Sequence, residues 1–151
     1  MLKLPVFEPR DADWEKRVRN IFTQQGALAL LDARIAELEP GRCVVAAPFR
    51  SELAQQHGYF HAGVTSTLAD AAGGCAAATL FGADGDVLSV EFKINLLAPA
   101  HGETLVADAR VVRSGRTLSV CSIEVFVERD GQRSPCALMQ QTLIRVASAR
   151  A

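Results

Sequence analysis

The chain has no excess of charge of one sign and no cluster of basic residues. Its 151 residues contain 16 Lys and Arg against 17 Asp and Glu, a formal net charge of -1. Proteins that bind nucleic acids or anionic membrane surfaces carry clustered basic side chains. The charge balance therefore argues against nucleic-acid and membrane partners and favours a small molecule.

Cysteine is scarce, and no two cysteines form a CxxC pair. The four cysteines lie far apart in apolar surroundings, at Cys43, Cys75, Cys121 and Cys136. This spacing is typical of small core residues and not of metal ligands or disulfide partners. The first thirty residues also lack the apolar run of a signal peptide. We therefore expect reduced thiols and a cytoplasmic location.

The length fits one domain that can bury a core without disulfides. We expect a single domain over 1–151, with an N-terminal arm and helix over 1–26 and a short tail over 147–151. Asp11 is expected to cap that first helix, which would run through Gln25.

Gly26 is expected to stop the first helix. Residues 27–39 stay open between two structures. Their alanines and leucines favour a helix, whereas the Pro40-Gly41 turn and the valine-rich strand 42–48 favour a hairpin. Sequence reasoning alone does not decide between them.

One segment combines helical length with almost no charge. It reads HAGVTSTLADAAGGCAAATLF from His61 to Phe81, and its only formal charge is Asp70. The pattern predicts a helix that is apolar nearly all round and therefore buried. Its glycines, threonines and central acid make it too polar for a membrane span. Burying an unpaired carboxylate costs about several kcal/mol, so Asp70 is the leading candidate for a functional residue.

Beyond Gly82 the period changes from that of a helix to that of a strand. Over 88–96 apolar and polar residues alternate strictly, which predicts one packed face and one wet face. The packed face is expected to contain Leu88, Val90, Phe92, Ile94 and Leu96. Turns at 99–102, 114–116 and 129–132 define three more strands, so we expect a four-strand antiparallel meander. The predicted fold class is α+β, with an antiparallel sheet wrapped around one long central helix.

The order of motifs resembles a known family, the PaaI-type hotdog-fold acyl-CoA thioesterases. The most specific parts are His61-Ala62-Gly63 at the start of the helix and Leu68-Ala69-Asp70 inside it. Strand 87–92 leading into Leu97-Ala98-Pro99-Ala100 and the hairpin Ser114-Gly115-Arg116-Thr117-Leu118 are also similar. Each piece is weak alone, but the order is specific, and the resemblance covers about Gln55 to Val146.

The resemblance implies the hotdog fold and hydrolysis of an acyl-CoA, either small to medium or aromatic, to free acid and CoA. It implies no metal and no bound cofactor. It also implies a homodimer or homotetramer in which the acid of one subunit faces the amide donors of another.

The family pattern assigns three catalytic elements. Asp70 falls on the catalytic carboxylate, which acts as nucleophile or as general base for water. A poorly solvated carboxylate suits either role. The N–H of Ala62, at a helix N-terminus, would polarise the thioester carbonyl. Gln55, fifteen residues before the acid, would supply a positioning amide, although the register can also fall on Gln56.

Further residues receive supporting roles. His61 is expected to orient the loop by hydrogen bonds, and Gly63 completes the motif as a substrate contact. The acyl pocket would be lined by Tyr59 and Phe60, whose alternative is plain core packing. The CoA phosphates would be held by Arg113 and Arg116, whose alternative is simple solvation.

Two positions depart from the family pattern. Many relatives have glycine where this chain has Ala62, but a backbone donor needs no particular side chain if φ is negative. A hydroxyl often found one turn after the acid is Gly74 here. We expect Ser66 or Ser89 to supply that hydroxyl.

Two other functions stay open. A hotdog enoyl-thioester hydratase or dehydratase would pair a histidine with an acid, for which His61 and Asp70 are available. A non-catalytic acyl-CoA-binding protein of the same fold would lack thiol release altogether.

Overall fold

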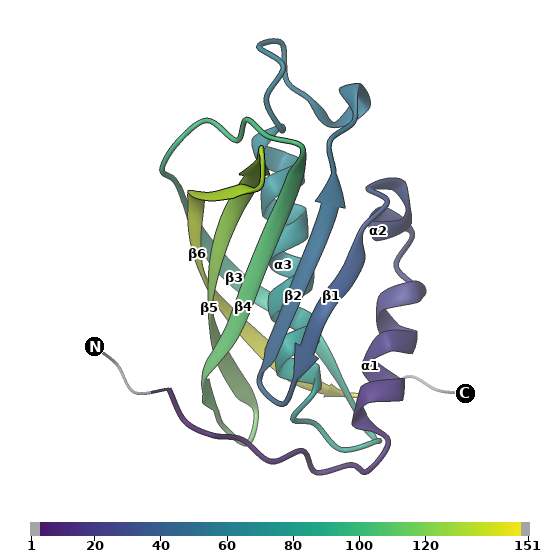
Figure 1. Ribbon diagram of the computed structural model, residues 1–151. Helices are drawn as coiled ribbons and strands as arrows, with labels where there is room; N and C mark the ends of the chain where they lie inside the picture. Colours follow the sequence, from purple (N-terminus) through teal and green to yellow (C-terminus); the bar gives the residue numbers. More distant parts are fainter. Residues whose placement is uncertain (1–3, 149–151) are drawn as a thin grey trace.

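The computed structural model describes residues 4–148, which form two short helices, a β-hairpin, a long helix and four further strands (Figure 1). The elements are α1 (Trp14–Thr23), α2 (Gly26–Leu30), β1 (Arg34–Glu39), β2 (Arg42–Pro48), a 3-10 turn (Ser51–Leu53), α3 (Ala62–Ala78), β3 (Gly85–Leu96), β4 (Thr104–Ser114), β5 (Leu118–Arg129) and β6 (Gln132–Ala147). This α+β composition confirms the predicted fold class. No helix within 4–148 is long and apolar enough to cross a membrane.

The six strands form one antiparallel sheet that curves around α3 (Figure 1). The strand order is β1-β2-β4-β5-β6-β3, so β3 pairs with β6 and not with its neighbour in sequence, β4. The expected four-strand meander is therefore wrong at its first connection. The long helix carries the chain away from β2 to the far edge of the sheet, and residues 97–103 return it to the side of β2. As a result β3 is an edge strand.

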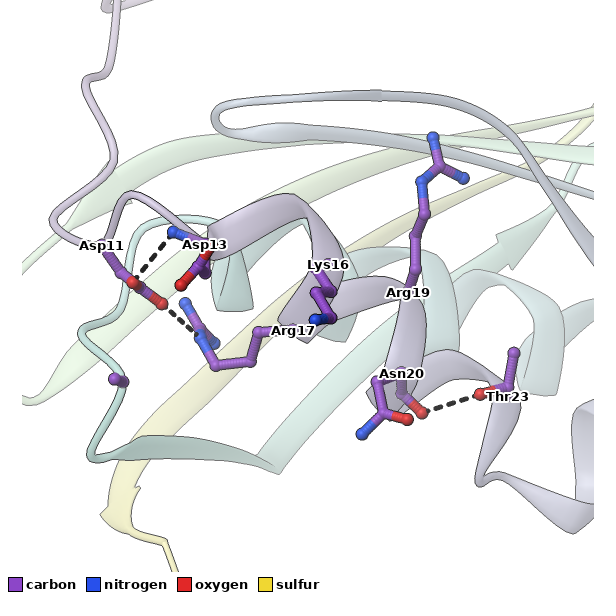
Figure 2. A pocket seen from close by; sticks show the side chains of 8 residues that line it. Asp11, Asp13, Lys16, Arg17, Arg19, Asn20 and Thr23 are labelled. Atoms are coloured by element: carbon purple, nitrogen blue, oxygen red, sulfur yellow. Dashed lines mark hydrogen bonds and ion pairs between the residues drawn. The ribbon is translucent and has the colours of Figure 1, made fainter.

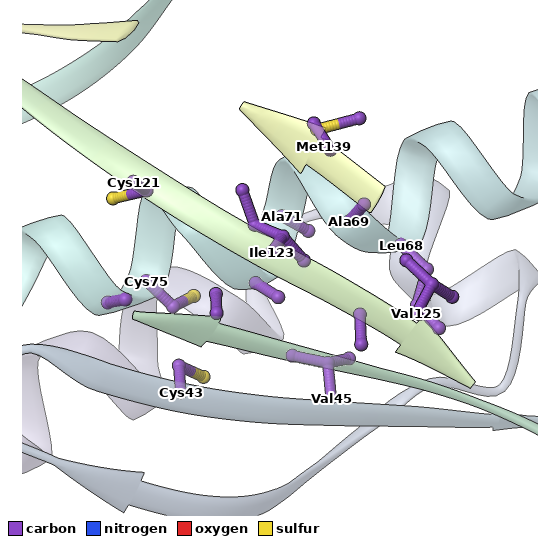
Figure 3. Close-up of a cluster of buried hydrophobic side chains, with 14 of the residues drawn as sticks. Cys43, Val45, Leu68, Ala69, Ala71, Cys75, Cys121, Ile123, Val125 and Met139 are labelled. Carbon is purple, nitrogen blue, oxygen red and sulfur yellow. The ribbon is translucent and has the colours of Figure 1, made fainter. Parts of the chain in front are cut away.

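The long helix α3 is the centre of the core, as predicted. Most of its side chains are small, so the sheet can approach the helix closely on several sides. Ile123, Val125 and Met139 from the sheet lie over Leu68 and its neighbours on the helix (Figure 3). The helix ends at Ala78, earlier than expected, and a turn through Phe81 completes the segment.

The N-terminal helix differs from the prediction at both ends. It begins at Trp14, because the Asp11 carboxylate accepts from the Asp13 N–H and pairs with Arg17 instead of capping the helix. It ends at Thr23, and Gly26 begins α2 and does not stop α1. The open segment 27–39 contains both expected structures, since a short helix precedes a strand that pairs with β2.

Arg17 ties α1 to the end of α3. Its buried guanidinium lies 3.0 Å from Asp11 Oδ2, a contact drawn in Figure 2. It also donates to the carbonyls of Ala78 at 3.1 Å and Phe81 at 2.7 Å. Carbonyls at a helix C-terminus have no intrahelical partner, so this cation satisfies them.

Replacing Arg17 with methionine is expected to lower the free energy of unfolding by about 3 kcal/mol, because the α3 carbonyls lose their buried donors. Arg19→Met is the matched control, since the ion pair of Arg19 within the described part of the chain is an exposed one with Glu15. It is expected to change stability by less than about 1 kcal/mol. Urea unfolding of the two variants measures the difference. Equal losses would show that Arg17 does not stabilise the end of α3.

All four cysteines are buried, and burial raises the pKa of the Cys121 thiol to about 12. A cysteine thiol in an unfolded chain has a pKa of about 8.5. Above that pH the unfolded chain loses a proton that the folded chain keeps, so the free energy of unfolding falls as pH rises toward the folded pKa.

We expect the urea midpoint to decrease from pH 8 to pH 10.5, and to decrease less steeply in Cys121→Ala than in the wild type. The comparison of slopes isolates the Cys121 thiol, because every other titratable group is the same in both proteins. Identical slopes would mean that Cys121 titrates alike in the folded and unfolded chains.

Candidate active site

Two cavities open against α3, and the predicted site residues divide between them. A cavity of about 410 Å³ contains Asp70 and Ser89 and lies between α3, β3 and α1. A cavity of about 460 Å³ contains Gln55 and Ala62 near the start of the helix. The acid and the amide donors are therefore found in different cavities of one chain.

Asp70 lies near the middle of α3 and is half-buried in the single chain. Its Oδ1 accepts from the Ser89 hydroxyl at 2.6 Å and from Gln141 Nε2 at 2.6 Å. Gln141 Nε2 also lies 3.0 Å from Ser89 Oγ and 3.3 Å from the Asp70 carbonyl oxygen. The lone charge of the helix is thus held by two uncharged donors from the sheet, with no cation in the network.

A β-bulge brings Ser89 to the acid. In the register of β3 with β6, Ser89 is opposite Leu143 and Glu91 is opposite Thr142, so Val90 is the extra residue. The insertion shifts the strand by one residue, so Ser89 pairs with the buried Leu143 and turns its hydroxyl toward the helix. The strict alternation expected over 88–96 is wrong at this point. The expected packed face is also wrong in the single chain, where Leu88, Val90, Phe92 and Leu96 are exposed and only Ile94 is partly buried.

Ser66 and Ser89 are the two residues expected to place a hydroxyl near Asp70, and only Ser89 does so. The Ser66 hydroxyl donates to the carbonyl of Ala62 at 2.8 Å, inside its own helix. Ser89 is the hydroxyl that contacts Asp70.

Gln141 is the site residue that our sequence reasoning missed. It lies on β6 and its side chain is 0% exposed. Its Oε1 has no hydrogen-bond partner among residues 4–148, and an unsatisfied buried acceptor costs about 1–3 kcal/mol. The signal was present in the strand period, because Met139, Gln141 and Leu143 alternate onto the buried face. A lone amide on that face is as informative as a lone acid in an apolar helix.

The second cavity presents two amide donors. Gln55 Oε1 accepts from the N–H groups of His57 at 2.5 Å and Tyr59 at 3.4 Å. These two bonds hold the side-chain amide in one orientation, in which Nε2 is available to donate to another group. Ala62 is the first residue of α3, and its N–H donates to nothing within 4–148. Its φ is negative, since the described non-glycine residues with positive φ are Asp32 and Asp130.

His61 caps the helix beside these donors. Its Nδ1 accepts from the Gly63 N–H at 2.9 Å, which leaves the ring proton on Nε2. This bond fits the orienting role predicted for His61. It also occupies the N–H of Gly63, so the free amide at this helix end is that of Ala62.

The remaining predicted residues are less closely grouped. Tyr59 and Phe60 line the cavity of Gln55, where Phe60 is buried and packs edge-on against Phe49 with ring centroids 5.2 Å apart. Arg113 and Arg116 are exposed near the β4–β5 turn and line neither cavity. Their assignment to the CoA phosphates stays a prediction.

The two halves of the predicted site are too far apart to act on one carbonyl within a single chain. Ala62 and Asp70 are eight residues apart in α3, which corresponds to about 12 Å along a helix axis. Reacting groups must lie within about 3–3.5 Å of the atoms they act on.

Comparison with known proteins shows the family of the chain. Residues 57–134 match the family model of the thioesterase superfamily. A crystal structure of a thioesterase family protein from Silicibacter pomeroyi is 42% identical, covers 89% of this chain and 99% of its own, and superposes with a TM-score of 0.88. The 1,4-dihydroxy-2-naphthoyl-CoA hydrolase of Listeria monocytogenes is 28% identical over 70% of this chain and 85% of its own length.

The fold is also that of the Escherichia coli PaaI protein from the phenylacetic acid degradation operon. That structure is 21% identical, covers 90% of this chain and 95% of its own, and has a TM-score of 0.80. The chain belongs to the thioesterase superfamily. It is a hotdog-fold thioester hydrolase, as the motif resemblance implied, and its likeness to the PaaI protein is one of fold.

Proposed function

We propose that this protein hydrolyses an acyl-CoA, small to medium or aromatic, to the free acid and CoA, with Asp70 as the reacting carboxylate. The observation that carries the proposal is the Asp70 carboxylate, held at the wall of a cavity by Ser89 and Gln141, with no neutralising cation among residues 4–148. Both described hydrogen bonds end on Oδ1, so Oδ2 is free to accept a proton or to attack carbon.

The Ala62 N–H and Gln55 Nε2 would bind the thioester carbonyl oxygen. Both are donors without a described acceptor and both line one cavity. Negative charge develops on that oxygen when the carbonyl carbon is attacked, and the positive end of the α3 dipole is placed to stabilise it.

The chemistry can follow either of two routes, which use the same carboxylate. As a general base, Asp70 accepts a proton from water while the water oxygen attacks the carbonyl carbon. As a nucleophile, Asp70 attacks that carbon itself and forms an anhydride that water then hydrolyses. In both routes the carbon–sulfur bond breaks and CoA leaves as a thiolate that takes up a proton. Neither route needs a metal or a bound cofactor.

A homodimer would complete the site, with Asp70 of one subunit facing Gln55 and Ala62 of the other. The edge strand β3 supports this assembly, because its backbone is unpaired along one side and its exposed apolar side chains include Val90 at 55%, Phe92 at 45% and Leu96 at 58% exposure. An exposed apolar edge strand is a template for pairing with another chain. Dimers of this kind can pair further into tetramers.

Val90→Lys is expected to convert the protein to a monomer at micromolar concentration and to lower the rate of hydrolysis about a hundredfold or more, since a displaced site loses orientation. The substitution removes little packing within the chain, because Val90 is mostly exposed. Leu30→Lys, on α2 with 74% exposure, is the control that keeps the assembly. Light scattering and activity check the pair together, and an active monomer would contradict the shared site.

The proposed activity is tested with saturated acyl-CoAs from acetyl to decanoyl and with benzoyl-CoA, by following release of the CoA thiol with a chromogenic disulfide. The protein's own thiols are buried and contribute little background. Thiol release is the expected result. Binding without release would indicate a non-catalytic acyl-CoA-binding protein, and hydration of crotonyl-CoA without release would indicate a hydratase.

A further inference from the structure

Gln141 is a fully buried amide on β6 whose only described hydrogen bonds go to the Asp70–Ser89 pair. It sits between Met139 and Leu143 on the buried face of the strand. An apolar side chain would pack there without a polar group to satisfy. The presence of an amide therefore requires an explanation from the site and not from the core.

Gly73 leaves the space that the Gln141 side-chain amide occupies, and this space is called the seat of Gln141 below. A Cβ added to Gly73 would lie 1.8 Å from Gln141 Oε1 and 3.0 Å from Gln141 Cδ, so any side chain there would displace the amide. Glycine is a poor helix former, and Gly73 has no unusual φ to justify it in the middle of α3. The severe clash is with Gln141, whereas Ile123 Cδ1, at 3.3 Å from the added Cβ, would have to give by only a few tenths of an ångström.

Chemistry fixes the orientation of the amide. With Nε2 toward the acid, its two N–H groups reach Asp70 Oδ1, Ser89 Oγ and the Asp70 carbonyl. The reverse orientation would set the amide oxygen against a carboxylate oxygen and a carbonyl oxygen, all of them acceptors. The amide therefore stays turned toward Asp70 even though its own Oε1 has no partner.

The two carboxylate oxygens of Asp70 differ in their hydrogen bonds. Both described bonds, from Ser89 and from Gln141, end on Oδ1, and none within 4–148 ends on Oδ2. Oδ1 is anchored by the protein, whereas Oδ2 keeps all its lone pairs for a reacting group.

We propose that Gln141 is a positioning residue for thioester hydrolysis, seated by Gly73, and that it anchors Oδ1 of Asp70 so that Oδ2 is the reacting oxygen. This inference rests on the proposed function of Asp70. On the general-base route Oδ2 takes the proton of the attacking water, and on the nucleophilic route Oδ2 forms the bond to the carbonyl carbon. Gln141 itself touches no substrate.

Gln141→Met gives the decisive variant, because it keeps the length of the side chain and removes both the donor and the unsatisfied Oε1. We expect the melting temperature to stay the same or rise, kcat to fall about 10- to 100-fold, and KM to change less than about twofold. Gln140→Met, the same change at the neighbouring exposed position on the outer face, is expected to leave kcat unchanged. A purely structural glutamine would alter the melting temperature and leave kcat as in the wild type.

A double-mutant cycle tests the seat. Gly73→Ala is expected to lower kcat when Gln141 is present and to have no further effect in Gln141→Ala, where the amide it would displace is gone. Additive losses would overturn the coupling. If the wild type hydrolyses none of the acyl-CoAs, both the proposed function and the positioning role of Gln141 are wrong. If the wild type is active and Gln141→Met keeps its kcat, the positioning role alone is wrong.

Discussion

Replacing Asp70 with asparagine is expected to lower kcat for acyl-CoA hydrolysis about a thousandfold, the largest effect of any single substitution considered for this protein. An asparagine Oδ1 can still accept from Ser89 and Gln141, so the network that holds the side chain is preserved. The amide that replaces Oδ2 can neither accept a proton from water nor attack carbon. The loss therefore reports on the chemistry of the carboxylate and not on the fold.

The measurement is kcat together with the melting temperature and the affinity for a non-hydrolysable acyl-CoA analogue. Folding and binding should be retained in Asp70→Asn. Asp84→Asn is the matched control, since Asp84 is an exposed acid paired with Arg145 and lines a different cavity from Asp70. Wild-type turnover in Asp70→Asn would show that another group carries the reaction.

Ala62→Pro is expected to lower kcat about 100- to 1,000-fold, because proline removes the one backbone N–H proposed to bind the developing oxyanion. Proline is tolerated at the first position of a helix, where its fixed φ suits the helix and no intrahelical bond is lost. His61 already has the extended backbone that precedes proline comfortably, with φ -62 and ψ 139. The helix should therefore form as before.

Ala62→Gly is the control for this substitution, because it changes the side chain and keeps the N–H. Its kcat should stay close to that of the wild type, which matches the glycine expected at this position in many relatives. A proline variant as active as the glycine variant would remove Ala62 from the mechanism.

The central helix could be predicted from sequence because its signal is local and long. A run of alanine and leucine with one acid indicates a buried helix, and the structure places that acid at a cavity wall. Gln55 and Ala62 line a second cavity together, and their assignment as amide donors stays a prediction. These features depend on residues that are near one another along the chain.

The features that were missed depend on contacts between distant segments. The pairing of β3 with β6 follows from the path of α3 across the sheet, which no turn motif records. The bulge at Val90 turns Ser89 toward Asp70, although the residue alternation alone places Ser89 on the opposite face. Gln141 is 71 residues from Asp70 in the sequence, and the contact between them forms only because β6 packs against α3.

The central claim is that one active site takes Asp70 from one subunit and the Ala62 N–H from another. The most direct measurement is the activity of a purified heterodimer of Asp70→Asn and Ala62→Pro chains, isolated with two different affinity tags. A two-fold dimer has two equivalent sites, so one site of this heterodimer would be intact and the other would carry both changes. We predict about half of the wild-type kcat per dimer, far above either parent homodimer. A heterodimer no more active than its parents would contradict a site shared between subunits.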